Sequence, residues 1–312
     1  MEVVGTGADG MTMGSALFAQ KFKKDEASAK IWNWFAITWQ NINQEDENMD
    51  LTMKNPGMKL MEGNHLSITR ATVAPFSANL LPKAFVLDSF FPEWDNTKVY
   101  VYATPEIGAK FIECKLAIEK DGGSKERILN GYENFLYIIR GQVEVIISGK
   151  TYSMEKEGYF WLPPMVDFEI KNKKEETAEI LWVRKKYQET KFFSVPDPII
   201  SSVLDITPIH SPAEEEQQCV PFEKNRGFDM AMNMLTFYPG VTFPFTETHV
   251  FEHGGYFLDG RGNFWINGIN YEVHEDDFCY MAPYAPHYVV AYGPEPLRYL
   301  LYKPVNRDFS LD

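Results

Sequence analysis

This sequence of 312 residues is poor in cysteine and in positive charge. Its three cysteines are Cys114, Cys219 and Cys279, an odd and widely spaced set without a CxxC pair. Such a set argues against a disulfide framework and indicates inert, buried thiols in a reducing compartment. The formal net charge of −14 at pH 7 argues against binding to nucleic acid or to an anionic membrane surface.

Long apolar runs are also missing, and the first residues do not have the pattern of a leader peptide. The N-terminus, MEVVGTGADG, has neither a basic segment nor an apolar core. The most apolar short run, residues 31–39, is interrupted by Asn33 and is far shorter than the roughly 18 residues of a membrane span. We therefore expect a cytoplasmic protein without a signal peptide or a membrane span.

Apolar residues make up 45% of the chain and aromatic residues 15%, enough for a sizeable core without disulfides. The length allows two domains. Residues 1–60 differ from the rest, because they hold six of the 13 methionines and an acidic run at 44–48. We expect an N-terminal extension of unknown role there, in which residues 15–40 could form a helical arm.

From about residue 66 the sequence has the pattern of an all-β protein. Short runs of Val, Ile, Tyr, Phe and Trp alternate with turn sequences such as NG at 130–131, SG at 148–149 and NG at 267–268. Strands of this length, with turns every 8–12 residues, are typical of a sandwich or a barrel. Residues 190–226 lack a sustained strand pattern and are expected to form a linker.

An internal repeat organises the chain. Residues 136–164 align with residues 255–283 without a gap, at a constant offset of 119 positions. The matched positions are Gly141 with Gly260, Gly149 with Gly268, Tyr152 with Tyr271, Glu157 with Asp276, and Pro164 with Pro283. Because turn glycines and strand aromatics coincide, the repeat predicts two copies of one β-unit.

The segment ETHVFEH, residues 247–253, can be read in two ways. On a helix it would match the H-x-x-E-H pattern of zinc peptidases. On a strand, Glu247 and His249 would share one face. Pro239, Gly240 and Pro244 precede the segment and Gly254 follows it, so a strand is favoured over a helix.

Four of the six histidines lie between residues 249 and 287. With a strand at 247–249, the side chains of Glu247, His249, His253 and His287 are expected to converge inside a barrel. One carboxylate and three imidazoles are a suitable donor set for Mn²⁺, Fe²⁺, Ni²⁺ or Zn²⁺. Burying such groups without a partner would be costly, which favours a metal site over ordinary core residues.

The repeat supplies an internal control for this site. The positions 119 residues before the four candidate ligands are Ile128, Asn130, Asn134 and Phe168. None of them is a strong metal ligand. We therefore expect a metal-free first unit and one metal site per chain.

The pattern of ligand, one residue, ligand, three residues, ligand and six residues before Gly260 resembles the cupin signature. The order here is Glu, His, His instead of the usual His, His, Glu. With the tail LRYLLYKPVNRD at 297–308, this order resembles the bicupin (S)-ureidoglycine aminohydrolase family of purine (allantoin) breakdown. Further matching stretches are residues 90–111, 135–145, 158–164 and 281–286.

This resemblance implies an all-β protein of two tandem cupin barrels, also called double-stranded β-helices or jelly rolls, behind the N-terminal extension. The first, metal-free barrel would occupy residues 61–190, and the metal-binding barrel residues 191–312. Because bicupin barrels have exposed edge strands that subunit packing can cover, we also expect a homo-oligomer.

The resemblance further implies a manganese enzyme that hydrolyses (S)-ureidoglycine to (S)-ureidoglycolate and ammonia. The implied metal ligands are Glu247, His249, His253 and His287. Tyr299 and Lys303 match positions that contact substrate, together with Glu247 and His287, and Glu247 and Lys303 are the implied catalytic residues.

Two positions depart from the family pattern. His287 stands where the family usually has glutamine, and Phe264 stands where a tyrosine is usual. These departures leave open another cupin metal enzyme acting on a small acid, such as a dioxygenase, decarboxylase or isomerase. A non-catalytic cupin that binds a small acid is the alternative from a different class.

Overall fold

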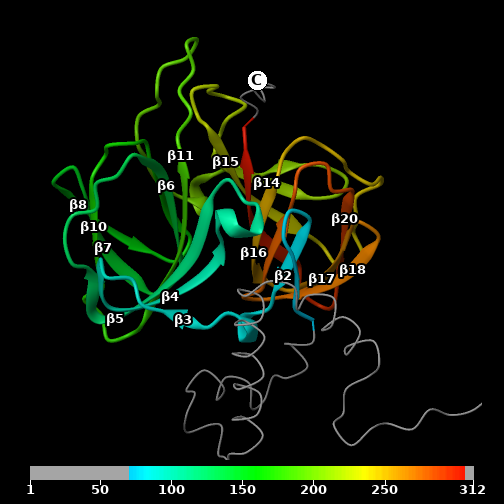
Figure 1. The fold of residues 1–312 in the computed structure, drawn as a ribbon, viewed down its shortest axis with the longest axis horizontal. Coiled ribbons are helices and arrows are strands. Elements are labelled where there is room, and N and C mark those ends of the chain that lie inside the picture. The colour runs from blue at the N-terminus through cyan, green and yellow to red at the C-terminus, as the bar shows by residue number, and fades with distance from the viewer. Residues whose placement is uncertain (1–69, 306–312) are drawn as a thin grey trace, which may run out of the picture. The chain divides into compact units, whose positions relative to one another are not determined.

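The structure, a computed structural model, describes residues 70–305, which are almost entirely β-sheet (Figure 1). Within this range it contains 21 strands and three short 3-10 helices. The expected all-β class is confirmed. The predicted N-terminal extension, residues 1–60, lies outside the described residues.

The first barrel is built from strands drawn in cyan to green in Figure 1. Their bounds are β3 Asp88–Ser89, β4 Trp94–Ala103, β5 Ile112–Ser124, β6 Tyr132–Arg140, β7 Gln142–Ile147, β8 Lys150–Glu155, β9 Gly158–Leu162, β10 Phe168–Lys171, β11 Ala178–Lys186 and β12 Ile199–Ser202. The 3-10 helices in the described residues are η2 Lys83–Phe85, η3 Pro105–Ile107 and η4 Val203–Asp205.

The second barrel is drawn mainly in yellow to red, with two cyan strands added to it. Its strands are β1 Thr72–Ala74, β2 Ala78–Leu81, β13 Ile209–His210, β14 Glu215–Val220, β15 Met230–Phe237, β16 His253–Asp259, β17 Arg261–Ile266, β18 Ile269–His274, β19 Phe278–Met281, β20 His287–Tyr292 and β21 Leu297–Pro304.

The internal repeat is confirmed by the backbone. Strands β7, β8 and β10 each begin 119 residues before β17, β18 and β20. Gly141 and Gly260 both have φ near +75°, a conformation that glycine adopts without strain. The hairpin residues Ser148 and Gly149 have positive φ, as do Asn267 and Gly268, which is the geometry of a two-residue type I′ turn.

Alternating burial explains why these segments form barrels. In β7 the residues Val143, Val145 and Ile147 are buried, and the residues between them are not. In β17 the buried set is Gly262, Phe264 and Ile266. A strand places successive side chains on opposite faces, so β7 and β17 each contribute one apolar row to the interior of their barrel, whereas β9 and β19 are buried on both faces.

Two short segments cross the division expected at residues 190 and 191. Strand β2 pairs with β19 through Leu80 and Cys279, and so joins the sheet of the second barrel. Strand β12 pairs with β9 through Ile200 and Phe160, and so joins the sheet of the first barrel. Three strands, β12, β13 and β14, also lie within residues 190–226, so the expected linker without strands is wrong.

The two barrels contact each other through a matched pair of acidic residues. Glu157 of the first barrel accepts two hydrogen bonds, of 2.6 and 2.7 Å, from Arg298 of the second. Its repeat partner Asp276 lies 3.7 Å from Lys115 and 3.4 Å from Arg140 of the first barrel. The repeat therefore places equivalent carboxylates on both sides of the interface.

The remaining expectations concern thiols and membrane spans. Cys114, Cys219 and Cys279 are buried and free, as predicted. Burial raises the pKa of the Cys114 and Cys219 thiols to about 12, which makes them unreactive near neutral pH. No helix in the described part of the chain is long and apolar enough to cross a membrane.

Candidate metal centre

The segment expected as a strand at 247–249 is an irregular loop held by a single bridge. Glu247 and His287 exchange two backbone hydrogen bonds, of 2.8 and 2.9 Å. The helix expected for a zinc peptidase is absent from this described segment, but a regular strand is absent as well. The prediction of a strand was wrong because the chain around Pro244 interrupts the pairing with β20 and leaves two isolated bridges, at Thr242 and at Glu247.

The three imidazoles come from different parts of the chain. His253 and His287 are the first residues of β16 and β20. His249 lies in the loop, where its carbonyl oxygen accepts a 2.7 Å hydrogen bond from the backbone amide of Tyr284. Their ligand nitrogens lie within 4.8 Å of one another, so the structure brings the predicted histidines together.

Backbone carbonyls orient two of these rings. Nδ1 of His287 lies 2.8 Å from the carbonyl oxygen of Ala285, and Nδ1 of His253 lies 3.3 Å from that of Tyr302. A proton on Nδ1 satisfies each carbonyl and leaves Nε2 as a free lone pair. The Nε2 atom of His287 lies 3.5 Å from a carboxylate oxygen of Glu247.

The contact between His249 and His253 tests whether these residues fit a metal ion. Their Nε2 atoms are 3.0 Å apart, and His249 Nδ1 is buried without a partner among residues 70–305. A proton between the two Nε2 atoms would leave Nδ1 of His249 as a buried, bare acceptor. A proton on Nδ1 would leave two lone pairs facing each other, an arrangement that a shared cation resolves.

The electrostatics agree with a cation-binding role. Burial holds the pKa of His253 well below its usual value of 6.5 and also lowers the pKa of His249. The contact with His287 lowers the pKa of Glu247. At neutral pH His249 and His253 are therefore neutral and Glu247 is ionised, the protonation states that a divalent metal requires.

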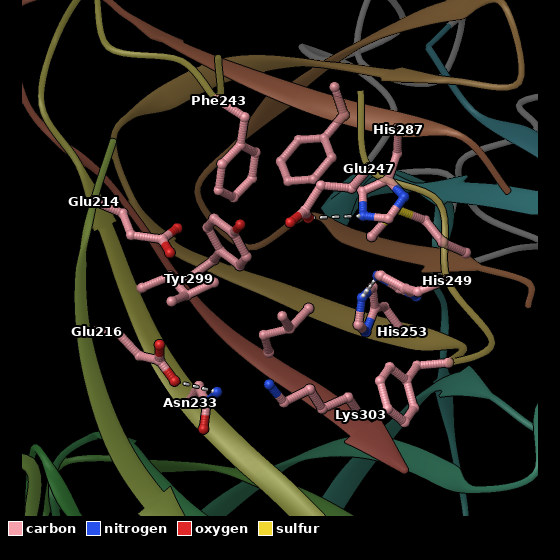
Figure 2. Close-up of a pocket in the computed structure, with 15 residues that line it drawn as sticks. Glu214, Glu216, Asn233, Phe243, Glu247, His249, His253, His287, Tyr299 and Lys303 are labelled. Atoms are coloured by element: carbon pink, nitrogen blue, oxygen red, sulfur yellow. Dashed lines mark hydrogen bonds and ion pairs between the residues drawn. The ribbon is translucent and has the colours of Figure 1, made fainter. Parts of the chain in front are cut away.

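These groups lie at one side of a pocket of about 180 Å³ (Figure 2). The lining residues are Glu214, Glu216, Asn233, Leu235, Phe243, Glu247, His249, Phe251, His253, Phe264, Met281, His287, Tyr299, Leu301 and Lys303. Six of these residues are apolar and nine carry a polar group, so the pocket is more polar than typical sites for small ligands.

Tyr299 and Lys303 both lie on β21, two positions on either side of Leu301, and all three side chains line the pocket. This spacing follows from the two-residue period of a strand. Burial, together with the nearby carboxylates of Glu214 and Glu247, raises the pKa of Tyr299 well above 10, so its hydroxyl stays protonated.

Sequence reasoning missed three polar residues of the pocket. Glu214 and Glu216 had been assigned to the linker, but Glu216 lies on β14, Glu214 directly precedes this strand, and both line the pocket with Asn233 of β15. Burial, then Glu216 and Glu247, raise the pKa of Glu214 to about 7. The available signal was the asparagine within the apolar run MAMNMLTF.

The comparisons with known proteins agree with the fold. The family model for the cupin domain matches twice, at residues 116–184 and 233–302. Solved structures that resemble the chain include protein Ylba from E. coli, with a TM-score of 0.72, 26% identity, and coverage of 80% of this chain and 99% of that one. A putative glyoxylate-induced protein from Pseudomonas aeruginosa has a TM-score of 0.71 and 29% identity, with coverage of 78% and 93%.

Two curated relatives share one enzyme name. The (S)-ureidoglycine aminohydrolase of Escherichia coli strain K12 is 28% identical over 250 residues, which cover 79% of this chain and 95% of the relative. The (S)-ureidoglycine aminohydrolase of Arabidopsis thaliana is 27% identical over 243 residues, with coverage of 77% and 79%. This chain is therefore a protein of two tandem cupin domains that resembles the (S)-ureidoglycine aminohydrolases over most of its length.

Proposed function

We propose that this protein is a metal-dependent hydrolase that converts (S)-ureidoglycine and water to (S)-ureidoglycolate and ammonia, a step of purine breakdown. The observation that carries the proposal is the convergence of Glu247 and three imidazoles in the pocket that also holds Lys303. The similarity to (S)-ureidoglycine aminohydrolases over both cupin domains supports the choice of substrate.

In this proposal Glu247, His249, His253 and His287 hold the metal ion, for which we favour Mn²⁺ over Fe²⁺, Ni²⁺ or Zn²⁺. When bound, the ion supplies a Lewis acid that polarises substrate atoms and lowers the pKa of a water molecule. At the position of His287 the family resemblance implies an amide; the imidazole is a stronger ligand but lacks an amide's paired donor and acceptor.

The chain's own residues then bind and orient the substrate. The ammonium group of Lys303 pairs with the substrate carboxylate, and the protonated hydroxyl of Tyr299 fixes the orientation. Glu247, whose carboxyl pKa is lowered by the contact with His287, receives a proton at its carboxylate from the attacking water and returns it to the departing amine. The C–N bond breaks, and the amine nitrogen leaves as ammonia.

The aromatic wall explains how the pocket excludes bulk water. Phe264 is buried and packs against Phe257 and Tyr299, with ring centroids 5.4 and 5.6 Å apart. It provides no hydroxyl where the family resemblance implies a tyrosine, so orientation of the substrate depends more on Tyr299 and Lys303. We place the enzyme in the cytoplasm, where buried free thiols are stable, and expect a homo-oligomer.

The test is ammonia release from freshly generated ureidoglycine. Chelator-stripped protein should be inactive, and restoring Mn²⁺ should restore release with formation of the S product. Glu247→Gln should reduce turnover by about 100-fold or more, because general acid–base catalysis contributes factors of this size. If protein that rebinds one metal ion per chain releases no ammonia, the substrate assignment is wrong; oxygen consumption with Fe²⁺ would then indicate a dioxygenase.

A further inference from the structure

The wall of the pocket opposite the metal ligands is unusually rich in hydrogen-bond acceptors. Figure 2 shows Glu214, Glu216 and Asn233 on one side, with Glu247 and the histidines on the other. The proposed metal, Lys303 and Tyr299 account for the amine-bearing carbon and the carboxylate of the substrate. They leave the acceptor wall without a role.

Two acceptor atoms on this wall are unsatisfied. Oε2 of Glu214 and Oδ1 of Asn233 are buried and have no hydrogen-bond partner among the residues that the structure describes. Asn233 as a whole is only 3% exposed. A buried acceptor without a partner is costly and is rare in native proteins, so these atoms indicate a ligand that brings donors.

The orientation of Asn233 is fixed by its neighbour. Its amide nitrogen donates a 2.6 Å hydrogen bond to Oε1 of Glu216, and Gln218 donates to the same oxygen at 3.3 Å. Turning the amide over would place its oxygen against a carboxylate, which is unfavourable. Asn233 therefore offers an acceptor, not a donor.

A ureido group matches this wall. It carries three N–H donors and a single carbonyl acceptor, whereas the wall offers the acceptors of Glu214 and Asn233. The ammonium end of Lys303 points toward Asn233 (Figure 2) and is a cation within reach of the same part of the pocket. A site built to pair with donors rejects analogues that lack them, because its buried acceptors would then stay unpaired.

We propose that Glu214 and Asn233 bind the ureido group of the substrate and thereby set the specificity of the pocket for ureido acids. This inference rests on the proposed function, because it takes (S)-ureidoglycine as the ligand. It adds Asn233 of β15 and Glu214, which directly precedes β14, to the substrate-binding residues predicted from the sequence. Those predicted residues are Glu247, His287, Tyr299 and Lys303.

The test compares two inert ligands of nearly equal shape. N-carbamoylglycine carries a ureido group, and N-acetylglycine replaces its terminal amine with a methyl group. Calorimetry on Mn²⁺-saturated protein should show at least about 10-fold tighter binding of N-carbamoylglycine, as expected when a buried acceptor would otherwise stay unpaired. Glu214→Gln and Asn233→Ala should each remove most of this preference.

Glu215→Gln is the matched control. Glu215 lies on the other face of β14, where it pairs with His210 at 3.3 Å and accepts a 2.9 Å hydrogen bond from Tyr238. Its replacement should leave the preference unchanged. Equal affinity of the wild type for the two ligands would overturn the inference, whether or not the variants fold. So would a preference that persists in both pocket variants.

Turnover separates this inference from the proposed function. Ammonia release from ureidoglycine without a preference for N-carbamoylglycine would keep the reaction and reject the ureido-binding role. A preference lost in Glu214→Gln, in protein that releases no ammonia, would keep the ureido-binding wall and reject the reaction.

Discussion

The two barrels have the same arrangement of strands. Among the described residues, only the second barrel carries a candidate metal centre. An isolated bridge joins Ile128 to Phe168 in the first barrel, and the same bridge joins Glu247 to His287 in the second. Both members of the second pair lie 119 residues after those of the first. The scaffold therefore fixes the positions, and the side chains alone decide whether a site exists.

The difference is clearest at the histidines. Asn130 and Asn134 occupy the positions of His249 and His253, and Nδ2 of Asn134 donates a 3.1 Å hydrogen bond to Oδ1 of Asn130. Trp182 in turn donates to Oδ1 of Asn134 at 3.1 Å. At these two positions the first barrel thus pairs its polar groups in neutral hydrogen bonds. The second barrel leaves convergent lone pairs, which a cation can satisfy.

Removing a ligand from the second barrel should have the largest effect. His249→Ala should lower metal affinity and turnover by about 100-fold or more, because even residues that merely support metal ligands contribute up to that factor. The matched variant of the first barrel, Asn130→Ala, should change neither. Metal content by mass spectrometry and ammonia release measure both.

Loss of the metal in Asn130→Ala would contradict the assignment of the site to the second barrel alone, since both barrels would then contribute to it. One tightly bound ion per chain in His249→Ala would contradict the role of His249 as a metal ligand. In that case the ion would bind elsewhere, and the lone-pair contact with His253 would need another explanation.

The fold was predictable because its signals are local. Turn glycines such as Gly141 and Gly260, and the alternation in β7 and β17, are written in short stretches that require no knowledge of distant partners. The constant offset then located the equivalents of Glu247 and His287. Pairing at a single bridge, in place of a strand, depends on neighbouring turns and was not visible.

The acceptor wall was not predictable for the opposite reason. The β14 sequence, EEQQCV, has no apolar alternation, and it becomes a strand because β15 pairs with it through contacts such as Glu216 with Leu235. The same holds for β2, which reaches β19 across about 200 residues of chain. Long-range pairing overrides weak local propensity in both cases.

The two barrels carry cations at equivalent positions of the repeat. Lys303 lines the metal pocket, and its repeat partner Arg184 lines a hollow of the first barrel, with its guanidinium 4.5 Å from the ring of Trp182. Lys303→Met should raise KM about 10- to 100-fold, the range for losing a charged hydrogen bond to the substrate carboxylate. Arg184→Met should leave KM unchanged.

Steady-state kinetics with ureidoglycine give both values. An unchanged KM in Lys303→Met would remove the assigned role in carboxylate binding. An equal rise in both variants would indicate that the effect comes from loss of general positive charge and not from a contact in the second barrel.

The smallest expected effect is on the stability of the metal-free protein. Because burial lowers the pKa of His253 below 6.5, the unfolded chain binds this proton before the folded chain does. The contribution of His253 to the free energy of unfolding should therefore be fully present above pH 6.5. It should fall as the pH drops toward the lowered pKa, by up to about 1.4 kcal/mol per pH unit. His253→Asn, which installs the residue of the first barrel, should remove this contribution.

Urea unfolding of chelated wild type and variant between pH 7.5 and 5.5 measures the difference. Glu133 and Glu214, with pKa values raised to about 8 and about 7, gain protons on folding in this range and act with the opposite sign. Only the difference between the two proteins is therefore diagnostic. Parallel pH profiles would mean that His253 is not held neutral, and the second barrel would then lack the electrostatic feature that distinguishes it from the first.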